Sequence, residues 1–210
     1  SNAHLSDYAI SLFRTQVVPD KKHEGLSQFL VDLRNTKGIT IRPIYDLAGG
    51  HHFNEVHYED AFVPEDARVG KDGDGWKQVT TELGFERSAP VRYLSSIRLV
   101  LELLKEVGKG PGERAAVLVG RLTAHLNTLR QMSLSVAAML QAGKSPNLEA
   151  SVVKDIGTTF EQEIPELVHA LIGAEPHLQT GSEFERTLGF LVQHAPSFSL
   201  RAGTRKVPRG

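Results

Sequence analysis

The spacing of apolar residues changes near residue 75, and this change limits the folds open to the chain. Before it, four short runs at residues 7–15, 26–33, 38–44 and 54–63 are rich in Ile, Val, Phe and Tyr and are bounded by Pro, Gly, Asp or Asn. Such runs are typical of β-strands. After it, apolar residues recur every three or four positions, as on one face of an α-helix. The sequence therefore predicts an α+β chain in which an antiparallel β-domain precedes helices.

We place a domain boundary in the Gly-rich run at residues 70–75, because Gly clusters mark loops. This gives a β-domain at residues 4–74 and a helical domain at residues 75–210. Four strands with open edges make a poor independent domain, since unpaired edge groups invite association. The first domain is therefore expected to be part of a larger sheet.

The second domain is predicted to contain long helices joined by short loops, which favours an antiparallel bundle. The first helical segment is interrupted by Pro90, which should kink or restart it. The next segments are predicted at residues 113–142, from Pro146 through Pro165, and at residues 183–194. The apolar stripe expected on the first segment consists of Trp76, Val79, Leu83, Pro90, Leu94, Ile97, Leu101 and Leu104.

Composition excludes several classes of function. The net charge is −1, so no basic surface for nucleic acid or for an anionic membrane is indicated. The sequence has no cysteine, which excludes disulfides and thiolate ligands. No run approaches the roughly 18 apolar residues of a membrane span, and the adjacent His51 and His52 lack spaced partner ligands for a metal. We expect a cytoplasmic protein with no metal, nucleic-acid or membrane partner.

Glu86 and Arg87 are the candidate functional pair. At 100° per residue they flank the stripe that contains Leu83 and Leu94, so both lie at the rim of the packing face. Burial of a carboxylate at such a rim would raise its pKa and make it a better base. A boundary salt bridge or a solvated helix edge would give the same spacing, because charged residues commonly occupy these margins.

Residues 53–87, FNEVHYEDAFVPEDARVGKDGDGWKQVTTELGFER, resemble the junction between the β-domain and the C-terminal helical domain of acyl-CoA dehydrogenases. The matching elements are Asn54-Glu55-Val56, Tyr58, Glu59-Asp60, Val63-Pro64, Gly75-Trp76 and Glu86-Arg87. Residues 197–210 resemble the flavin-facing loop of the family, which carries a Gly-Thr pair. The resemblance implies an acyl-CoA substrate, FAD as cofactor, electron-transfer flavoprotein as acceptor, and a homodimer, homotetramer or heteromeric assembly.

In this family a glutamate takes the α-proton of the thioester while hydride leaves the β-carbon for the flavin. One place for that glutamate directly precedes the Gly-Thr pair, where this sequence has Ala202. The other place corresponds to Glu86, so the resemblance implies Glu86 as the catalytic base. It also implies that Arg87 binds substrate or braces the site, and that Gly203 and Thr204 contact the cofactor.

The sequence also departs from the family. Residues 108–114 and 172–181 replace the Arg-x-x-Phe-Gly and Gln-x-x-Gly-Gly-x-Gly motifs, and Arg205-Lys206 replaces the acidic residue after the Gly-Thr pair. The N-terminal helical domain and the first half of the β-domain have no counterpart, so we expect a part of a longer polypeptide that is inactive alone. A non-catalytic subunit of a heteromeric dehydrogenase and a ligand-free helical interaction module remain alternatives. The basic cluster of Arg201, Arg205, Lys206 and Arg209 is expected to be a solvated terminus, with contact to a pyrophosphate as the other possibility.

Overall fold

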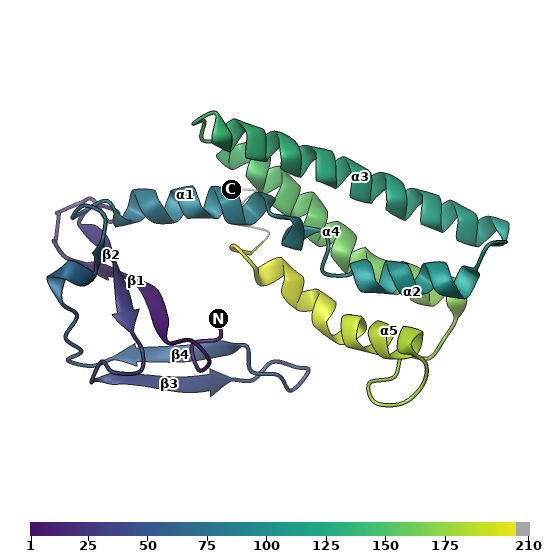
Figure 1. The fold of residues 1–210 in the computed structure, drawn as a ribbon, viewed down its shortest axis with the longest axis horizontal. Helices are drawn as coiled ribbons and strands as arrows, with labels where there is room; N and C mark the ends of the chain where they lie inside the picture. The colour runs from purple at the N-terminus through teal and green to yellow at the C-terminus, as the bar shows by residue number, and fades with distance from the viewer. Residues whose placement is uncertain (205–210) are drawn as a thin grey trace. The chain divides into compact units, whose positions relative to one another are not determined.

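The computed structural model describes residues 1–204, and the chain forms two compact units, Ser1–Thr81 and Glu82–Gly210. Antiparallel strands occupy the first unit and helices the second (Figure 1), which confirms the predicted α+β class. Helix α1 (Gly75–Ser88) contributes residues to both units. The domain boundary placed at residues 74 and 75 stays a prediction.

The first unit contains two antiparallel sheets. One has the strand order β1-β2-β5 and the other pairs β3 with β4. The elements are β1 (Tyr8–Arg14), β2 (Leu26–Asp32), β3 (Ile39–Ile44), β4 (Phe53–Tyr58), the 3-10 helix η1 (Glu65–Ala67) and β5 (Arg68–Val69). Each of the four predicted runs overlaps one strand, whereas β5 has only two residues and was missed.

Asp72 ties the Gly-rich loop before α1 to the first sheet. Its carboxylate accepts hydrogen bonds from the hydroxyl groups of Ser27 and Thr15, both at 2.8 Å, and from the Gln16 amide at 2.9 Å. These bonds hold the pKa of Asp72 below its usual value, and the bond from Ser27 has the largest effect. The loop that leads into α1 is therefore anchored by charge-assisted hydrogen bonds.

The second unit is a helical bundle, as predicted. After α1 come the 3-10 helix η2 (Pro90–Arg92), α2 (Ile97–Val107), α3 (Glu113–Gln141), α4 (Asn147–Ile172), α5 (Glu183–His194) and the 3-10 helix η3 (Ala195–Leu200). In Figure 1, α4 runs beside α3, and α2 and α5 lie together against one end of α4. Their shared core contains Leu99, Leu103, Leu122, Leu129, Phe160, Ile164, Val168 and Leu188 among others.

The apolar stripe predicted for the first helical segment is wrong at Leu101 and Leu104, although Ile97 packs against the core. Leu101 and Leu104 are 51% and 43% exposed, whereas Leu99 and Leu103 are fully buried. The reason is that no single helix spans this segment, because α1 ends at Ser88 and α2 begins anew at residue 97. The turn between them resets the helical phase, so positions counted from α1 do not carry over to α2.

Candidate active site

The site forms where α1 ends. The residue before Pro90 is extended, with Ala89 at φ −63° and ψ 148°, as expected of a residue that precedes proline. The chain then turns through η2 and brings Arg92 back onto α1. The Arg92 Nε donates to the Glu86 carbonyl oxygen at 3.0 Å, and its Nη2 donates to Glu86 Oε1 at 2.5 Å.

Glu86 and Arg92 differ sharply in exposure. The Arg92 side chain is 5% exposed and that of Glu86 is 43% exposed. Burial lowers the pKa of the Arg92 guanidinium, and the adjacent Glu86 carboxylate opposes this effect. Within residues 1–204, Glu86 Oε2 makes no hydrogen bond or ion pair. The carboxylate is thus held by one oxygen, and the other oxygen is available to a ligand.

Arg87 lies away from Glu86 and contacts two other segments of the second unit. Its Nε donates to the Ala202 carbonyl oxygen at 3.3 Å, and its Nη1 donates to Ser151 Oγ on α4 at 3.3 Å. The cation that pairs with Glu86 is therefore Arg92 and not the adjacent Arg87. Sequence reasoning missed Arg92, although the expected break at Pro90 was a signal that the chain folds back here.

The loop after η3 carries the predicted Gly-Thr pair. Ala202 and Gly203 both have positive φ, at 54° and 91°, so the backbone turns sharply before Thr204. The buried Lys154 of α4 donates to the Gly203 carbonyl oxygen and, at 3.4 Å, to that of Ser199. Thr204 is exposed, and its hydroxyl makes no hydrogen bond within residues 1–204. The Arg87–Ala202 contact brings this loop to the end of α1, the helix that carries Glu86.

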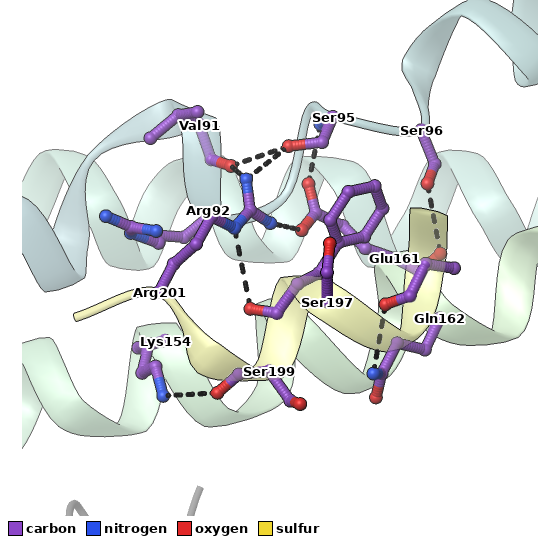
Figure 2. Close-up of polar contacts among 12 residues, drawn as sticks. Val91, Arg92, Ser95, Ser96, Lys154, Glu161, Gln162, Ser197, Ser199 and Arg201 are labelled. Carbon is purple, nitrogen blue, oxygen red and sulfur yellow. Dashed lines mark hydrogen bonds and ion pairs between the residues drawn. The ribbon is translucent and has the colours of Figure 1, made fainter. Parts of the chain in front are cut away.

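A buried ion pair lies beneath the loop (Figure 2). Glu161 of α4 is fully buried, and its Oε2 accepts from Arg201 Nη2 at 2.5 Å while its Oε1 accepts from the Ser95 N–H at 2.5 Å. Arg201 Nη1 also donates to Ser95 Oγ at 2.7 Å and to the Val91 carbonyl at 3.1 Å. Burial raises the pKa of Glu161, and the Arg201 charge opposes the increase.

Arg201 is therefore a structural cation, which corrects its interpretation as part of a solvated basic terminus. Its guanidinium also lies 4.5 Å from the centroid of the Phe198 ring. The other members of that cluster, Arg205, Lys206 and Arg209, lie outside the described residues. The ion pair fixes η3 and the following loop against α4 and η2.

Residues 1–204 contain neither a cluster of metal ligands nor a helix that could span a membrane. No group of three or more His, Asp or Glu side chains there is arranged to hold a metal ion. No helix of that part is long and apolar enough to cross a membrane. The chemistry available at the end of α1 is thus that of an accessible carboxylate, an arginine that holds it, and a loop with an exposed hydroxyl.

The sequence is similar to several curated bacterial proteins, although no protein-family model matches it. It is 34% identical over 168 residues to the acyl-CoA dehydrogenase FadE34 of Mycobacterium tuberculosis, covering 79% of this chain and 23% of that protein. It is 30% identical to the acyl-CoA dehydrogenase IpdE1 of the same organism, with coverages of 88% and 48%, and 30% identical to its FadE29, with coverages of 100% and 59%. The chain thus spans less than two thirds of each relative.

Solved structures share the fold. The Tcur3481-Tcur3483 steroid ACAD matches with a TM-score of 0.82 at 22% identity, covering 100% of this chain and 56% of that one. Glutaryl-coenzyme A dehydrogenase in its glutaryl-CoA complex matches with a TM-score of 0.79 at 18% identity, with coverages of 99% and 54%. The ChsE4-ChsE5 complex from Mycobacterium tuberculosis matches with a TM-score of 0.76 at 26% identity, with coverages of 100% and 56%.

Proposed function

The chain belongs to the acyl-CoA dehydrogenase family, as the C-terminal half of the β-domain with the helical domain that follows it, and we propose that it is part of an FAD-dependent dehydrogenase of acyl-CoA thioesters. The observation that carries this proposal is the Glu86 carboxylate, 43% exposed and held at one oxygen by a buried arginine. An accessible carboxylate fixed in this way suits a general base. Glu86 takes the proton from the α-carbon of the thioester.

Bound FAD would accept the hydride that leaves the β-carbon. Among the described residues, Gly203 and Thr204 fit a contact with that cofactor, because Lys154 and Arg87 fix the turn and the Thr204 hydroxyl is exposed without a partner. Arg87 braces this turn through the Ala202 carbonyl and shapes the substrate side of the site. Ala202 carries no carboxylate, so Glu86 alone supplies a base from these two places.

The remaining flavin contacts come from outside this chain. Residues 108–112 form the connection between α2 and α3, and residues 173–182 form that between α4 and α5. Both connections stand where the two missing family motifs would be. We therefore propose that the complete site needs the rest of a longer polypeptide and a second subunit, as a homodimer, homotetramer or heteromer. A cytoplasmic enzyme with electron-transfer flavoprotein as acceptor is part of the same proposal.

A non-catalytic subunit of a heteromeric acyl-CoA dehydrogenase is the second candidate. The absence of both motifs from the sequence favours it, and the solved ChsE4-ChsE5 complex has the same fold. In this case the chain would contribute packing surface and the Gly203-Thr204 loop while the partner supplies the base. A helical interaction module without a ligand is the weakest candidate, because it gives no role to the exposed, arginine-held carboxylate of Glu86.

Glu86→Gln tests the proposal in the full-length protein with its partner subunit and FAD. Removal of a general base should lower kcat by about 10²–10⁴-fold, while the visible absorbance of bound FAD is unchanged. Glu82→Gln is the matched control, because Glu82 is an exposed glutamate one turn earlier on α1. Wild-type turnover by Glu86→Gln would reject Glu86 as the base. If that result came from an active heteromer, the non-catalytic role would be supported.

A further inference from the structure

We propose that Arg92 is a positioning residue that holds Glu86 by Oε1, so that Oε2 is the atom that accepts the α-proton. This inference rests on the proposed function of Glu86 as base. The evidence is the two-point contact of one guanidinium with a single residue, at the Glu86 carbonyl and at its carboxylate. Such a contact fixes both the backbone and the side-chain direction of the glutamate.

The contact of Arg92 with the Glu86 carbonyl caps the end of α1. Glu86 lies in the last turn of this helix, where carbonyl groups lack the usual intrahelical donor. The Arg92 Nε supplies a donor to the Glu86 carbonyl at 3.0 Å, beside a longer bond of 3.4 Å from the Ala89 N–H. The backbone that carries the base is thereby held where a free helix end would fray.

The packing around Arg92 fixes the arginine itself. A Cβ atom added to Gly157 of α4 would come within 2.4 Å of the Arg92 carbonyl oxygen, so the backbone of α4 packs directly against η2. Arg92 is 5% exposed, and within residues 1–204 its Nη1 has no hydrogen-bond partner. A buried arginine in this position has little freedom, and it transfers that rigidity to Glu86.

The charges around Arg92 explain why its partner should be a carboxylate. Arg201 repels it, whereas Glu86 and the more distant Glu161 attract it. A buried cation that loses its nearest counter-charge is strongly disfavoured. The Glu86 carboxylate, hydrogen-bonded to Arg92, is therefore the nearest counter-charge to this buried cation before substrate arrives.

Transfer of the α-proton to Glu86 Oε2 accounts for every bond that forms and breaks. The lone pair of Oε2 binds the α-proton, and the electron pair of the broken C–H bond would form the α,β double bond if bound FAD accepted the hydride from the β-carbon. Glu86 is then neutral and Arg92 lacks its counter-charge. Release of the proton to water once the product has left restores the carboxylate.

The test compares Arg92→Met and Arg92→Lys in the FAD-loaded, full-length protein with its partner, using α-deuterated and ordinary acyl-CoA. Misplacement of a reacting group by about 1 Å can cost about 10²-fold, so Arg92→Met should lower kcat about 10–100-fold with little change in KM. The α-deuterium isotope effect on kcat should rise, because proton transfer becomes slower. Arg92→Lys should recover part of kcat, and the exposed Arg98→Met should match the wild type.

The double variant Glu86→Gln/Arg92→Met separates positioning from folding. If Arg92 acts through Glu86, it should be no slower than Glu86→Gln alone. Losses that multiply, or an unchanged isotope effect in Arg92→Lys and Arg92→Met, would overturn the inference. Poor folding of Arg92→Met with wild-type kinetics in Arg92→Lys would overturn it too. Wild-type turnover by Glu86→Gln would instead reject the proposed function, which is a different outcome.

Discussion

Arg201→Met should destabilise the second unit by removing one partner of a buried ion pair. Glu161 is fully buried, and the Arg201 side chain is 25% exposed. Breaking a buried pair typically costs about 3–5 kcal/mol, because a charge remains buried without compensation. The partial exposure of Arg201 places the expected loss near the lower end, at about 3 kcal/mol. Lost hydrogen bonds to Ser95 and Val91 contribute to this loss.

The same substitution should cost less once the carboxylate is neutral. Glu161→Gln retains an oxygen that can accept from the Ser95 N–H, and its own cost should be about 1–3 kcal/mol. In that background no buried anion remains for Arg201 to neutralise. We expect a coupling free energy between the two substitutions of about 1–3 kcal/mol, within the range found for residues in direct contact.

Urea unfolding followed by two probes gives this measurement. Far-UV circular dichroism reports mainly the helical second unit, whereas Trp76, the one tryptophan in the sequence, lies in the first unit. Arg201→Met should lower the dichroism midpoint and leave the tryptophan fluorescence midpoint in place. If Arg201→Met costs the same in the presence and absence of the Glu161 carboxylate, the ion-pair argument is refuted.

Other substitutions and pH changes give matched predictions. Gly157→Ala would place its Cβ within 2.4 Å of a backbone oxygen of η2 and should lower the free energy of unfolding, followed by dichroism, by about 1–3 kcal/mol. Gly120→Ala, which has open space around it on α3, should raise that free energy by about 1 kcal/mol. Equal effects of the two substitutions would refute the close-contact argument. The hydrogen bond from Ser27 above all lowers the pKa of Asp72, so the stabilisation by this group is present above its unfolded pKa and is lost as pH falls through the folded value. The fluorescence midpoint should therefore fall on acidification more in the wild type than in Asp72→Asn, and parallel curves would count against it. Burial raises the pKa of Glu161, so the pH dependence of its contribution to stability is opposite to that of Asp72. The stabilisation by Glu161 is present below its unfolded pKa and is lost as pH rises through its folded pKa. Relative to Glu161→Gln, the dichroism free energy of unfolding should decline over that rise, and an increase would reverse the assignment.

Local patterns predicted most of the secondary structure because the elements are long enough to show their period. The helix predicted at residues 113–142 is α3, and its apolar positions Leu122, Leu129 and Val136 are buried. Strand β5 could not be found in this way, since two residues show no period. Its assignment depends on pairing with β2, which lies about 40 residues earlier in the sequence.

The polar network beneath the loop was beyond the reach of pattern analysis for a related reason. Glu161 and Lys154 lie on α4 and would read as solvated helix positions, yet both are fully buried. They are satisfied by Arg201 and by backbone carbonyls of the segment after α5. Buried charges require such partners, but the sequence does not show which distant segment supplies them.

The partner of Glu86 shows how one local break decides the chemistry of the site. On an uninterrupted helix, Arg92 would lie six positions after Glu86 and about 240° around the axis, away from its side chain. Pro90 ends that helix, and the turn through η2 folds Arg92 back onto the same glutamate. The neighbour Arg87, the apparent partner in sequence, instead fixes the Ala202 loop. Replacing Pro90 by a helix former would therefore separate Glu86 from Arg92 without altering either residue.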